Sequence, residues 1–414
     1  MDTTQSLTEC RICKSYNIVP FIQIPSMAFP GTIARYCVCN DCGTVMDEGN
    51  PLVHYIESCQ TCSLECALRH YLEVGAGIDF MARILLAMKS LERERKREEH
   101  PRFLDIGCGF GFSCSIAQFL HWDPTGVEPN QMGVFGSKML GIPILHSYLE
   151  NTDLMPEHFD YVYSSEVIEH VRDVDLFVAT IARYLKPEGV LVLTTPNGQV
   201  LRGLDAVEQE WRESLYPGYH VNVFSPASLE MVLRRNGMSS VQIILSEGTS
   251  GRKRMIAFAS RARHLPSIPW QELNLKPFVR SYLEHLIAQQ EKRQESGSLY
   301  QGALYRLIEL LINSGDYTGT EKAIAKLDEV LLREGKPLEK YDQVRAANLE
   351  EYLHQVPAFA GLYAYYKGIF YLNYCNNYSR AEQYFRLGQD LCTLEGTIDA
   401  GAIYLRRYWP EKCR

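Results

Sequence analysis

The chain has 414 residues, enough for two or three domains that each bury their own core. Its 42 basic and 50 acidic residues give a formal net charge of −8, which argues against a dedicated nucleic-acid binder, because such proteins carry a basic excess or a basic face. No apolar run approaches the ~20 residues of a membrane span, and the opening MDTTQSLTEC lacks the pattern of a secretion signal, so we expect a cytoplasmic protein.

Paired cysteines near the N-terminus predict a metal site. Cys10 and Cys13 form one C-x-x-C pair, and Cys39 and Cys42 form a second, each in a turn-like context. Four thiolates give zinc a closed tetrahedral site with no position open for chemistry, so we expect a structural zinc ion. Zinc binding would supply folding energy that so short a segment cannot gain from its core. Cys37 is an extra thiol that leaves the ligand set open.

The zinc-binding domain is predicted over residues 1–53, and a helical connector over residues 54–100. Cys59, Cys62 and Cys66 lie at the spacing of one helix face. A second metal site there is the alternative to simple packing of small buried residues.

The stretch FLDIGCGFGFSCSIA, residues 103–117, is the most informative part of the chain. An apolar strand ends at Asp105, a turn passes through Gly107, Gly109 and Gly111, and a helical pattern begins. Glycines suit this turn because a backbone without side chains lets a ligand lie against the N-terminus of a helix.

Two acidic residues indicate which ligand this loop binds. Glu128, in TGVEPN, stands at the spacing at which a doubly wound sheet presents a carboxylate to a ribose. Dinucleotide-binding loops read G-x-G-x-x-G, whereas here Asp105 precedes the first glycine, where a carboxylate attracts an ammonium group and repels a pyrophosphate. S-adenosylmethionine carries an ammonium group, a sulfonium and no phosphate. The pattern resembles that of class I S-adenosylmethionine-dependent methyltransferases.

Three later segments resemble the same family in the expected order. HFDYVYSSEVIEHVRD (158–173) resembles its fourth strand and the following turn, and LKPEGVLVLTTPN (185–197) resembles its fifth strand. YHVNVFSPASLEMVLRRNGM (219–238) is similar to the stretch that leads into its final helix and hairpin. The resemblance implies a Rossmann-like α/β domain with a seven-stranded sheet over residues 101–262.

The resemblance also implies the residues that hold the cofactor. Asp105 and the glycine-loop backbone would hold the methionine part, and Glu128 would accept both ribose hydroxyls. Residues after the third strand would border the adenine, and those at the end of the fourth would face the methyl group. The implied set is Asp105, Gly107, Gly109, Gly111, Glu128, Pro129, Leu149, Glu150, Ser165 and Glu166.

Methyl transfer is an in-line displacement at carbon, so the protein must position both reactants and, for an oxygen or carbon acceptor, remove a proton. Histidine accepts a proton near neutral pH, which makes His220 in GYHVNVFS and His170 in EVIEH candidate bases. Glu169 is a third candidate, and His170 is alternatively a residue that orients its loop. Tyr216 and Tyr219 either orient an acceptor hydroxyl or pack as structural residues.

The cysteine segment, ending YCVCNDCGTV, resembles the zinc-binding domain that precedes the methyltransferase domain in sugar C-methyltransferases. This resemblance implies C- or O-methylation of a sugar, a nucleotide sugar or a related small metabolite.

The last third of the chain departs from that family, whose carboxy-terminal domain is a second α/β unit. Residues 263–277 are predicted to be a proline-bearing linker, and residues 278–414 an all-α domain. LINSGDYTGTEKAIAKLDEVL (311–331) and LNYCNNYSRAEQYFRLGQDL (372–391) each place a tyrosine in a short turn before a helix. This arrangement is similar to tetratricopeptide hairpins, although the turn is longer.

Two alternatives to a small-molecule methyltransferase follow from this domain. The helical domain could recruit a protein, glycan or lipid-linked acceptor, or the chain could be a non-catalytic, cofactor-binding scaffold. RNA is the least favoured acceptor because of the acidic balance.

Overall fold

The computed structural model describes residues 7–29, 31–49, 64, 68, 72, 77–94, 100–202, 214–247, 253–342, 344–348, 351–352 and 355–398. Contacts divide the chain into two compact units, residues 1–60 with 83–273 and residues 61–82 with 274–414. The helix α3 (Ile78–Ser90) crosses this division. Cys59, Cys62 and Cys66 lie outside the described residues.

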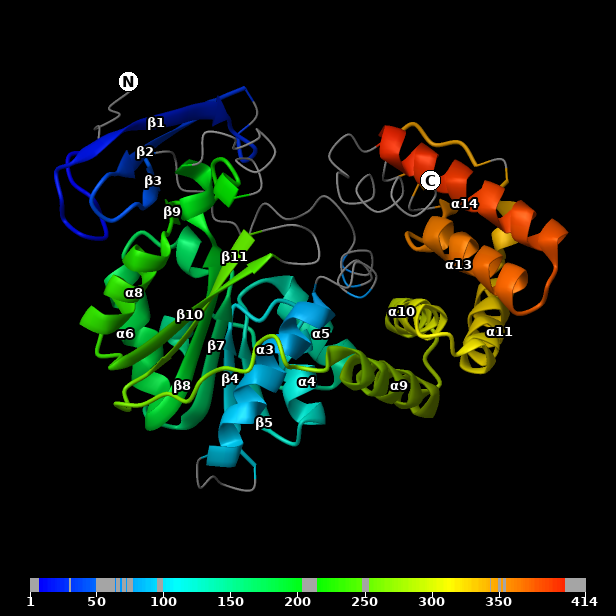
Figure 1. Ribbon diagram of the computed structural model, residues 1–414, viewed down its shortest axis with the longest axis horizontal. Coiled ribbons are helices and arrows are strands. Elements are labelled where there is room, and N and C mark those ends of the chain that lie inside the picture. The colour runs from blue at the N-terminus through cyan, green and yellow to red at the C-terminus, as the bar shows by residue number, and fades with distance from the viewer. Residues whose placement is uncertain are drawn as a thin grey trace. The chain divides into compact units, whose positions relative to one another are not determined.

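The first unit contains the expected seven-stranded sheet, in the order β10-β11-β8-β7-β4-β5-β6 (Figure 1). Five neighbouring strands run parallel, whereas β11 is antiparallel to both β8 and β10. The strands are β4 (Arg102–Ile106), β5 (Asp123–Val127), β6 (Ile144–Leu145), β7 (Phe159–Ser165), β8 (Leu185–Pro196), β10 (Ser240–Glu247) and β11 (Lys253–Ser260). The predicted α/β fold class is confirmed.

Helices cover both faces of this sheet, so its central strands are apolar on both sides. On one side lie α4 (Phe112–Phe119) and α5 (Gln131–Leu140), and on the other α6 (Val174–Tyr184) and α8 (Pro226–Arg235) (Figure 1). Short 3₁₀ turns connect several elements: η1 (Leu91–Glu94), η2 (Leu149–Asn151), η3 (Ile168–His170) and η4 (Gly198–Arg202). Capping fixes where α8 begins, because the Ser225 hydroxyl accepts from the Ser228 N–H at 3.1 Å.

A second, antiparallel sheet joins the cysteine segment to the α/β fold. Its order is β1 (Ile18–Pro25), β2 (Ile33–Cys39), β3 (Val45–Asp47) and β9 (Asn222–Val223). The strand β9 follows His220 almost directly, and Val45 pairs with Val223. The cysteine segment is therefore completed by a strand from the later part of the chain, which the sequence pattern did not predict.

The second unit is helical, as expected. Its helices are α9 (Leu275–Arg293), α10 (Ser298–Asn313), α11 (Tyr317–Arg333), the 3₁₀ turn η5 (Leu338–Lys340), α13 (Ala360–Asn373) and α14 (Tyr378–Ile398). The two similar stretches have the same local structure: Gly315 and Asn376 have positive φ, and Asp316 and Asn377 accept from a backbone N–H at the start of the next helix. The expected turn tyrosines are instead the first residues of α11 and α14.

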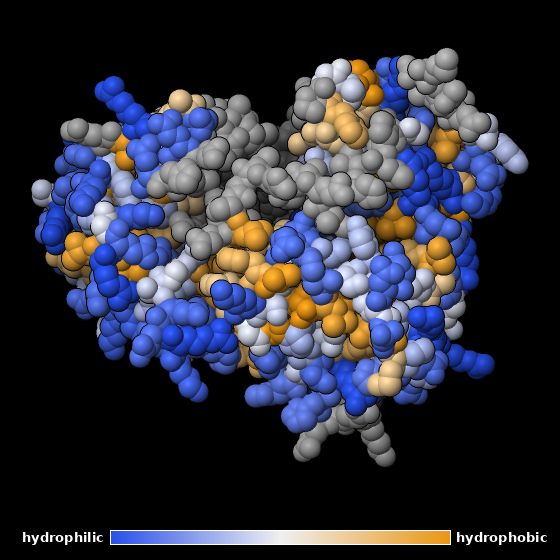
Figure 2. Space-filling view, turned by 180° about the vertical axis from the view of Figure 1, so that it is seen from behind, coloured by the Kyte–Doolittle hydropathy of each residue, from blue (hydrophilic) through white to orange (hydrophobic). Residues whose placement is uncertain are grey.

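No helix in the described part of the chain is long and apolar enough to cross a membrane. The face drawn in Figure 2 is mostly hydrophilic, with hydrophobic residues gathered in patches.

Candidate functional site

Parallel strands bring the predicted cofactor residues to one edge of the sheet. Asp105 pairs with Tyr163 and Gly126, and Ser165 pairs with Thr194, so β4, β5, β7 and β8 end together. Ligands of open α/β sheets bind outside the carboxyl ends of the strands, which places the candidate site at this edge.

The glycine loop after β4 needs glycine for its backbone conformation. Gly107, Gly109 and Gly111 have φ of +74°, +54° and +78°. A Cβ on Gly107 would lie 2.6 Å from Cγ2 of Val167, and one on Gly111 would lie 2.5 Å from Cδ1 of Ile142. The loop therefore lies directly against the segment that follows β7.

Asp105 presents an unsatisfied carboxylate oxygen beside this loop. The side chain is buried, its Oδ2 accepts a hydrogen bond from the Ser113 hydroxyl, and its Oδ1 is buried without a hydrogen-bond partner among the described residues. Burial raises the pKa of Asp105 to about 7, and the nearby Glu128 carboxylate adds to the shift. An orphaned, buried carboxylate oxygen of this kind suits a ligand ammonium group.

Glu128 is hydrogen-bonded to the same loop. Its Oε2 accepts from the Gly109 N–H at 2.9 Å, and its Oε1 accepts from the Asn130 N–H at 2.9 Å. Burial raises the pKa of Glu128, and these two donors partly offset the shift. A carboxylate has about four lone-pair sites, so both oxygens can still accept from a ribose diol.

The other predicted cofactor residues occupy the same edge with different exposures. Leu149 is buried in a core cluster that includes Val127, whereas Glu150 is exposed and Pro129 is half-buried. The Ser165 and Thr194 hydroxyls are 2.7 Å apart.

Glu166 follows β7 in an uncommon conformation. Its φ is +56°, in the left-handed region that non-glycine residues seldom adopt. Its N–H donates to the Thr194 carbonyl at 3.0 Å, and its Oε2 lies 3.5 Å from Nε of Arg254. Such strain persists only where the surroundings impose it, and it is common at functional sites.

The three predicted catalytic residues come together although the sequence separates them. A carboxylate oxygen of Glu169 and one ring nitrogen each from His170 and His220 all lie within 4.8 Å of one another. The two imidazole rings meet edge to face with centroids 4.8 Å apart, and His220 Nε2 is 4.0 Å from Glu169 Oε1. We call these three side chains the Glu-His-His cluster.

Backbone carbonyls fix the orientation of both rings. His170 Nδ1 lies 3.0 Å from the Tyr219 carbonyl, and His220 Nδ1 lies 2.7 Å from the Ser214 carbonyl. Because a carbonyl only accepts, each Nδ1 carries the hydrogen, and in a neutral imidazole the lone pair is then on Nε2. Burial lowers the pKa of His170 and raises that of Glu169 well above its usual range, so burial favours the neutral form of both.

The two neighbouring tyrosines pack on each other near His220. The rings of Tyr216 and Tyr219 stack with centroids 4.6 Å apart, and the Tyr216 ring lies 5.6 Å from that of His220. The backbone of Tyr219 holds His170, as described above.

Sequence reasoning missed two threonines at this edge of the sheet, of which Thr195 supports the cluster. The Thr195 hydroxyl donates to Glu169 Oε2 at 2.9 Å, and Thr194 contacts both Ser165 and Glu166. The TTPN end of the fifth strand was the available signal, because it reaches the same sheet edge.

Sequence reasoning also missed an ion-pair network, centred on the buried Asp47, between the cysteine segment and the cluster. Arg11, which lies between Cys10 and Cys13, is 2.8 Å from Asp47, and Asp47 is 3.2 Å from Arg172. The Asp47 N–H donates to the Val221 carbonyl, and the Val221 N–H donates to the Glu169 carbonyl at 2.7 Å. The network connects the first cysteine pair to the backbone that carries Glu169 and His220.

The four predicted zinc ligands lie together with spacing that fits zinc. The sulfur atoms of Cys10 and Cys42 are 3.6 Å apart, and those of Cys13 and Cys39 are 3.5 Å apart. A tetrahedron with Zn–S bonds of about 2.3 Å places sulfurs about 3.8 Å apart. Cys37 is outside this group, and its sulfur faces the Met46 carbonyl at 3.7 Å.

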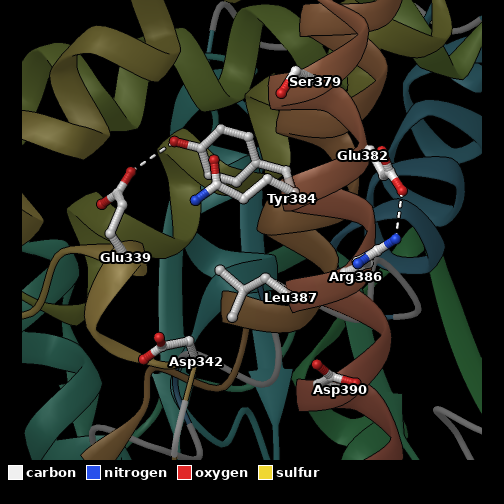
Figure 3. Close-up of a pocket in the computed structure, with 9 residues that line it drawn as sticks. Glu339, Asp342, Ser379, Glu382, Tyr384, Arg386, Leu387 and Asp390 are labelled. Atoms are coloured by element: carbon white, nitrogen blue, oxygen red, sulfur yellow. Dashed lines mark hydrogen bonds and ion pairs between the residues drawn. The ribbon is translucent and has the colours of Figure 1, made fainter.

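A separate hollow of about 390 Å³ lies in the helical unit, between η5 and α14 (Figure 3). Tyr384 donates to Glu339 at 2.6 Å, and Arg386 pairs with Glu382. Its described lining residues include four acids and one base: Glu339, Asp342, Ser379, Glu382, Gln383, Tyr384, Arg386, Leu387 and Asp390.

The raised pKa of Asp105 predicts a pH dependence for binding a cationic ligand. Below about pH 7, binding must first remove the proton from Asp105, so affinity for S-adenosylmethionine should fall about tenfold between pH 8 and pH 6. Calorimetric titration between pH 6 and pH 8 measures this affinity. In D105N, affinity should be weak and nearly independent of pH.

The raised pKa of Asp105 also makes the stability of the ligand-free protein depend on pH, but in the opposite direction to the ligand affinity. The folded pKa of about 7 exceeds the ordinary 3.8, so the protonated form is favoured on folding and stability declines as the pH rises from about 4 through 7. D105N should therefore raise the Tm of the ligand-free protein at pH 8. An unchanged or lowered Tm, with pH-independent wild-type affinity, would contradict the role given to Asp105.

Comparison with known proteins agrees with this geometry. Residues 69–243 match a family model described as a methyltransferase domain. This segment is a methyltransferase domain. It contains both the glycine loop and the Glu-His-His cluster.

Among curated relatives, the ubiquinone biosynthesis O-methyltransferase of Bradyrhizobium diazoefficiens is 34% identical over 135 residues, which cover 28% of this chain and 53% of that protein. The enzyme of the same name from Bartonella quintana is 29% identical over 153 residues, covering 32% of this chain and 62% of its own length. The chain thus spans about half the length of the curated relatives it matches. A solved Thermotoga maritima S-adenosylmethionine-dependent methyltransferase, a possible histamine N-methyltransferase, is 18% identical with a TM-score of 0.35, covering 48% of this chain and 99% of that one.

Proposed function

We propose that the chain transfers the methyl group of S-adenosylmethionine to an oxygen or carbon atom of a sugar, a nucleotide sugar or a related small metabolite. The observation that carries this proposal is a juxtaposition at one sheet edge. The acidic glycine loop, suited to the cofactor, meets a segment whose Glu-His-His cluster is suited to proton removal.

The cofactor would lie along the ends of β4, β5 and β7. Asp105 Oδ1 would accept from the ammonium group, the loop backbone would contact the methionine part, and Glu128 would accept from both ribose hydroxyls. Leu149 and Glu150 would border the adenine, and Ser165 and Glu166 would face the methyl group.

The chemistry needs little beyond positioning and proton removal. The acceptor atom forms a bond to the methyl carbon, the carbon–sulfur bond breaks, and its electrons neutralise the sulfonium. The acceptor's proton must leave, and we assign its removal to the Glu-His-His cluster, whose polar atoms lie within 4.8 Å of one another.

The choice of acceptor has two supports. The resemblance of the cysteine segment to that of sugar C-methyltransferases favours a sugar. The matched relatives are named O-methyltransferases, which favours oxygen as the acceptor atom.

Transfer of labelled methyl from S-adenosylmethionine into an extract of the source cell, separated by molecular size, tests the proposal. We expect label in the small-molecule fraction, followed by turnover with nucleotide sugars. No label in any fraction, with the cofactor still bound, would contradict the proposed activity.

We also propose a structural zinc ion on Cys10, Cys13, Cys39 and Cys42, supported by their sulfur spacing. The double variant C39S/C42S should lose about one zinc per chain in elemental analysis and unfold at lower temperature, because zinc binding contributes to folding. Its methyl transfer should fall as well, since Arg11 and Asp47 connect this segment to the cluster.

The variant C37S is the matched control, because Cys37 lies outside the sulfur group. It should keep its zinc. Equal zinc content in wild type and C39S/C42S would contradict the assignment.

A second candidate is methylation of a protein, glycan or lipid-linked acceptor recruited by tetratricopeptide-like hairpins of the helical unit. The acidic hollow favours it, because a surface lined by carboxylates attracts cationic segments. Label in the macromolecular fraction, lost in E339Q/D342N, would support this candidate over the first.

A further inference from the structure

We propose that Glu169, His170 and His220 bind a divalent first-row cation, which in turn holds two neighbouring oxygen atoms of the acceptor. This inference rests on the proposed function and specifies how its proton removal works. It names the acceptor class as well: a vicinal diol.

The donor set is the first support. Two imidazoles and one carboxylate form a combination that binds Zn²⁺, Fe²⁺, Mn²⁺ or Co²⁺ and leaves positions open for other ligands. The ligand atoms lie within 4.8 Å of one another, and the 4.0 Å between Glu169 Oε1 and His220 Nε2 is slightly longer than the roughly 3.0–3.6 Å that metal bonds of about 2.1 Å give. A bound cation would have to draw these two atoms closer together.

An unsatisfied buried oxygen is the second and independent support. Glu169 is fully buried, and its Oε1 has no hydrogen-bond partner in the described part of the chain. A buried carboxylate oxygen without a donor is costly, and a cation at the centre of the cluster would satisfy it.

The surroundings are the third support, because the fold already holds the other polar atom of each ligand. Thr195 donates to Glu169 Oε2, and backbone carbonyls accept from Nδ1 of both histidines. Metal-bound histidines almost always donate their second N–H in this way, which fixes the ring and directs Nε2 to the ion.

The position of the cluster connects the ion to methyl transfer. Glu169 and His170 follow Val167, which lies against Gly107 of the cofactor loop. Three protein ligands leave up to three positions of an octahedral ion open, enough for two adjacent acceptor oxygens. A bound cation lowers the pKa of a coordinated hydroxyl. The proton passes to solvent, the oxygen bonds to the methyl carbon, and the carbon–sulfur electron pair stays on sulfur.

Manganese binding followed by electron paramagnetic resonance tests this without requiring turnover. Chelator-treated full chain, reloaded with one equivalent of zinc for the cysteine site, is titrated with Mn²⁺. We expect the wild-type chain to bind about one Mn²⁺, which lowers the resonance signal of free Mn²⁺ by that amount. E169Q and H220Q should weaken this binding by at least about 100-fold, because each loses a ligand.

H285Q, in the helical unit, is the histidine control and should bind as wild type does. Retained binding of S-adenosylmethionine by E169Q and H220Q shows that these variants fold. Equal Mn²⁺ binding by wild type and E169Q would overturn the cation site and leave the cluster as a direct proton acceptor. Failure of the proposed function is distinguishable, since it would appear as bound Mn²⁺ without bound cofactor or methyl transfer.

Discussion

Replacing Glu128 with alanine should weaken binding of S-adenosylmethionine by about 100-fold or more. Glu128 Oε2 accepts from the glycine loop and Oε1 accepts from the Asn130 N–H, and each charge-assisted hydrogen bond that we assign to a ribose hydroxyl contributes about 1.5–3 kcal/mol. The substitution also removes the acceptors of the Gly109 and Asn130 N–H groups, which loosens the loop. Calorimetric titration measures the affinity directly.

A second ligand separates the roles of the two acids. Methylthioadenosine keeps the ribose but lacks the ammonium group, so E128A should weaken both ligands, whereas D105N should weaken S-adenosylmethionine far more. E157A removes an exposed carboxylate that pairs with Arg261 and should change neither affinity. Unchanged affinity in E128A would contradict the ribose assignment.

Replacing His220 with alanine should lower kcat for methyl transfer by about 10²- to 10⁴-fold, because it removes one of the three side chains to which we assign loss of the acceptor's proton, whether directly or through a bound cation. Its ring is buried against His170 and held by the Ser214 carbonyl, so the substitution removes one of the three side chains of the cluster. Affinity for S-adenosylmethionine should change little, because we assign cofactor binding to Asp105 and Glu128. Steady-state rates and titration on the same preparation test both statements.

H158A is the matched control. His158 precedes β7, at the start of the strand rather than at the end that carries the site, and it should leave kcat unchanged. A wild-type kcat in H220A would remove this residue from the proposed chemistry.

The glycine loop and the acid after β5 were predictable because their signals are local. Asp105, the three glycines and Glu128 each sit at the end of a parallel strand, so sequence spacing alone places them at one edge. The unsatisfied Asp105 oxygen and its raised pKa were not predictable, because they depend on burial from several elements.

The Glu-His-His cluster was predictable only as three separate candidates. His170 and His220 are 50 residues apart, and their contact depends on β9 pairing with β3 of the cysteine segment. Nothing local in the sequence encodes that pairing. The network of Arg11, Asp47 and Arg172 was not predictable for the same reason, because its members come from three distant segments.

Titrating the purified chain with S-adenosylmethionine and, separately, with NAD⁺ measures most directly which ligand this loop binds. We expect one S-adenosylmethionine per chain, competed by S-adenosylhomocysteine, and no heat from NAD⁺, because Asp105 attracts an ammonium group and repels a pyrophosphate. Binding of NAD⁺, or no binding of S-adenosylmethionine by the folded protein, would contradict a methyl-donor site at the end of β4.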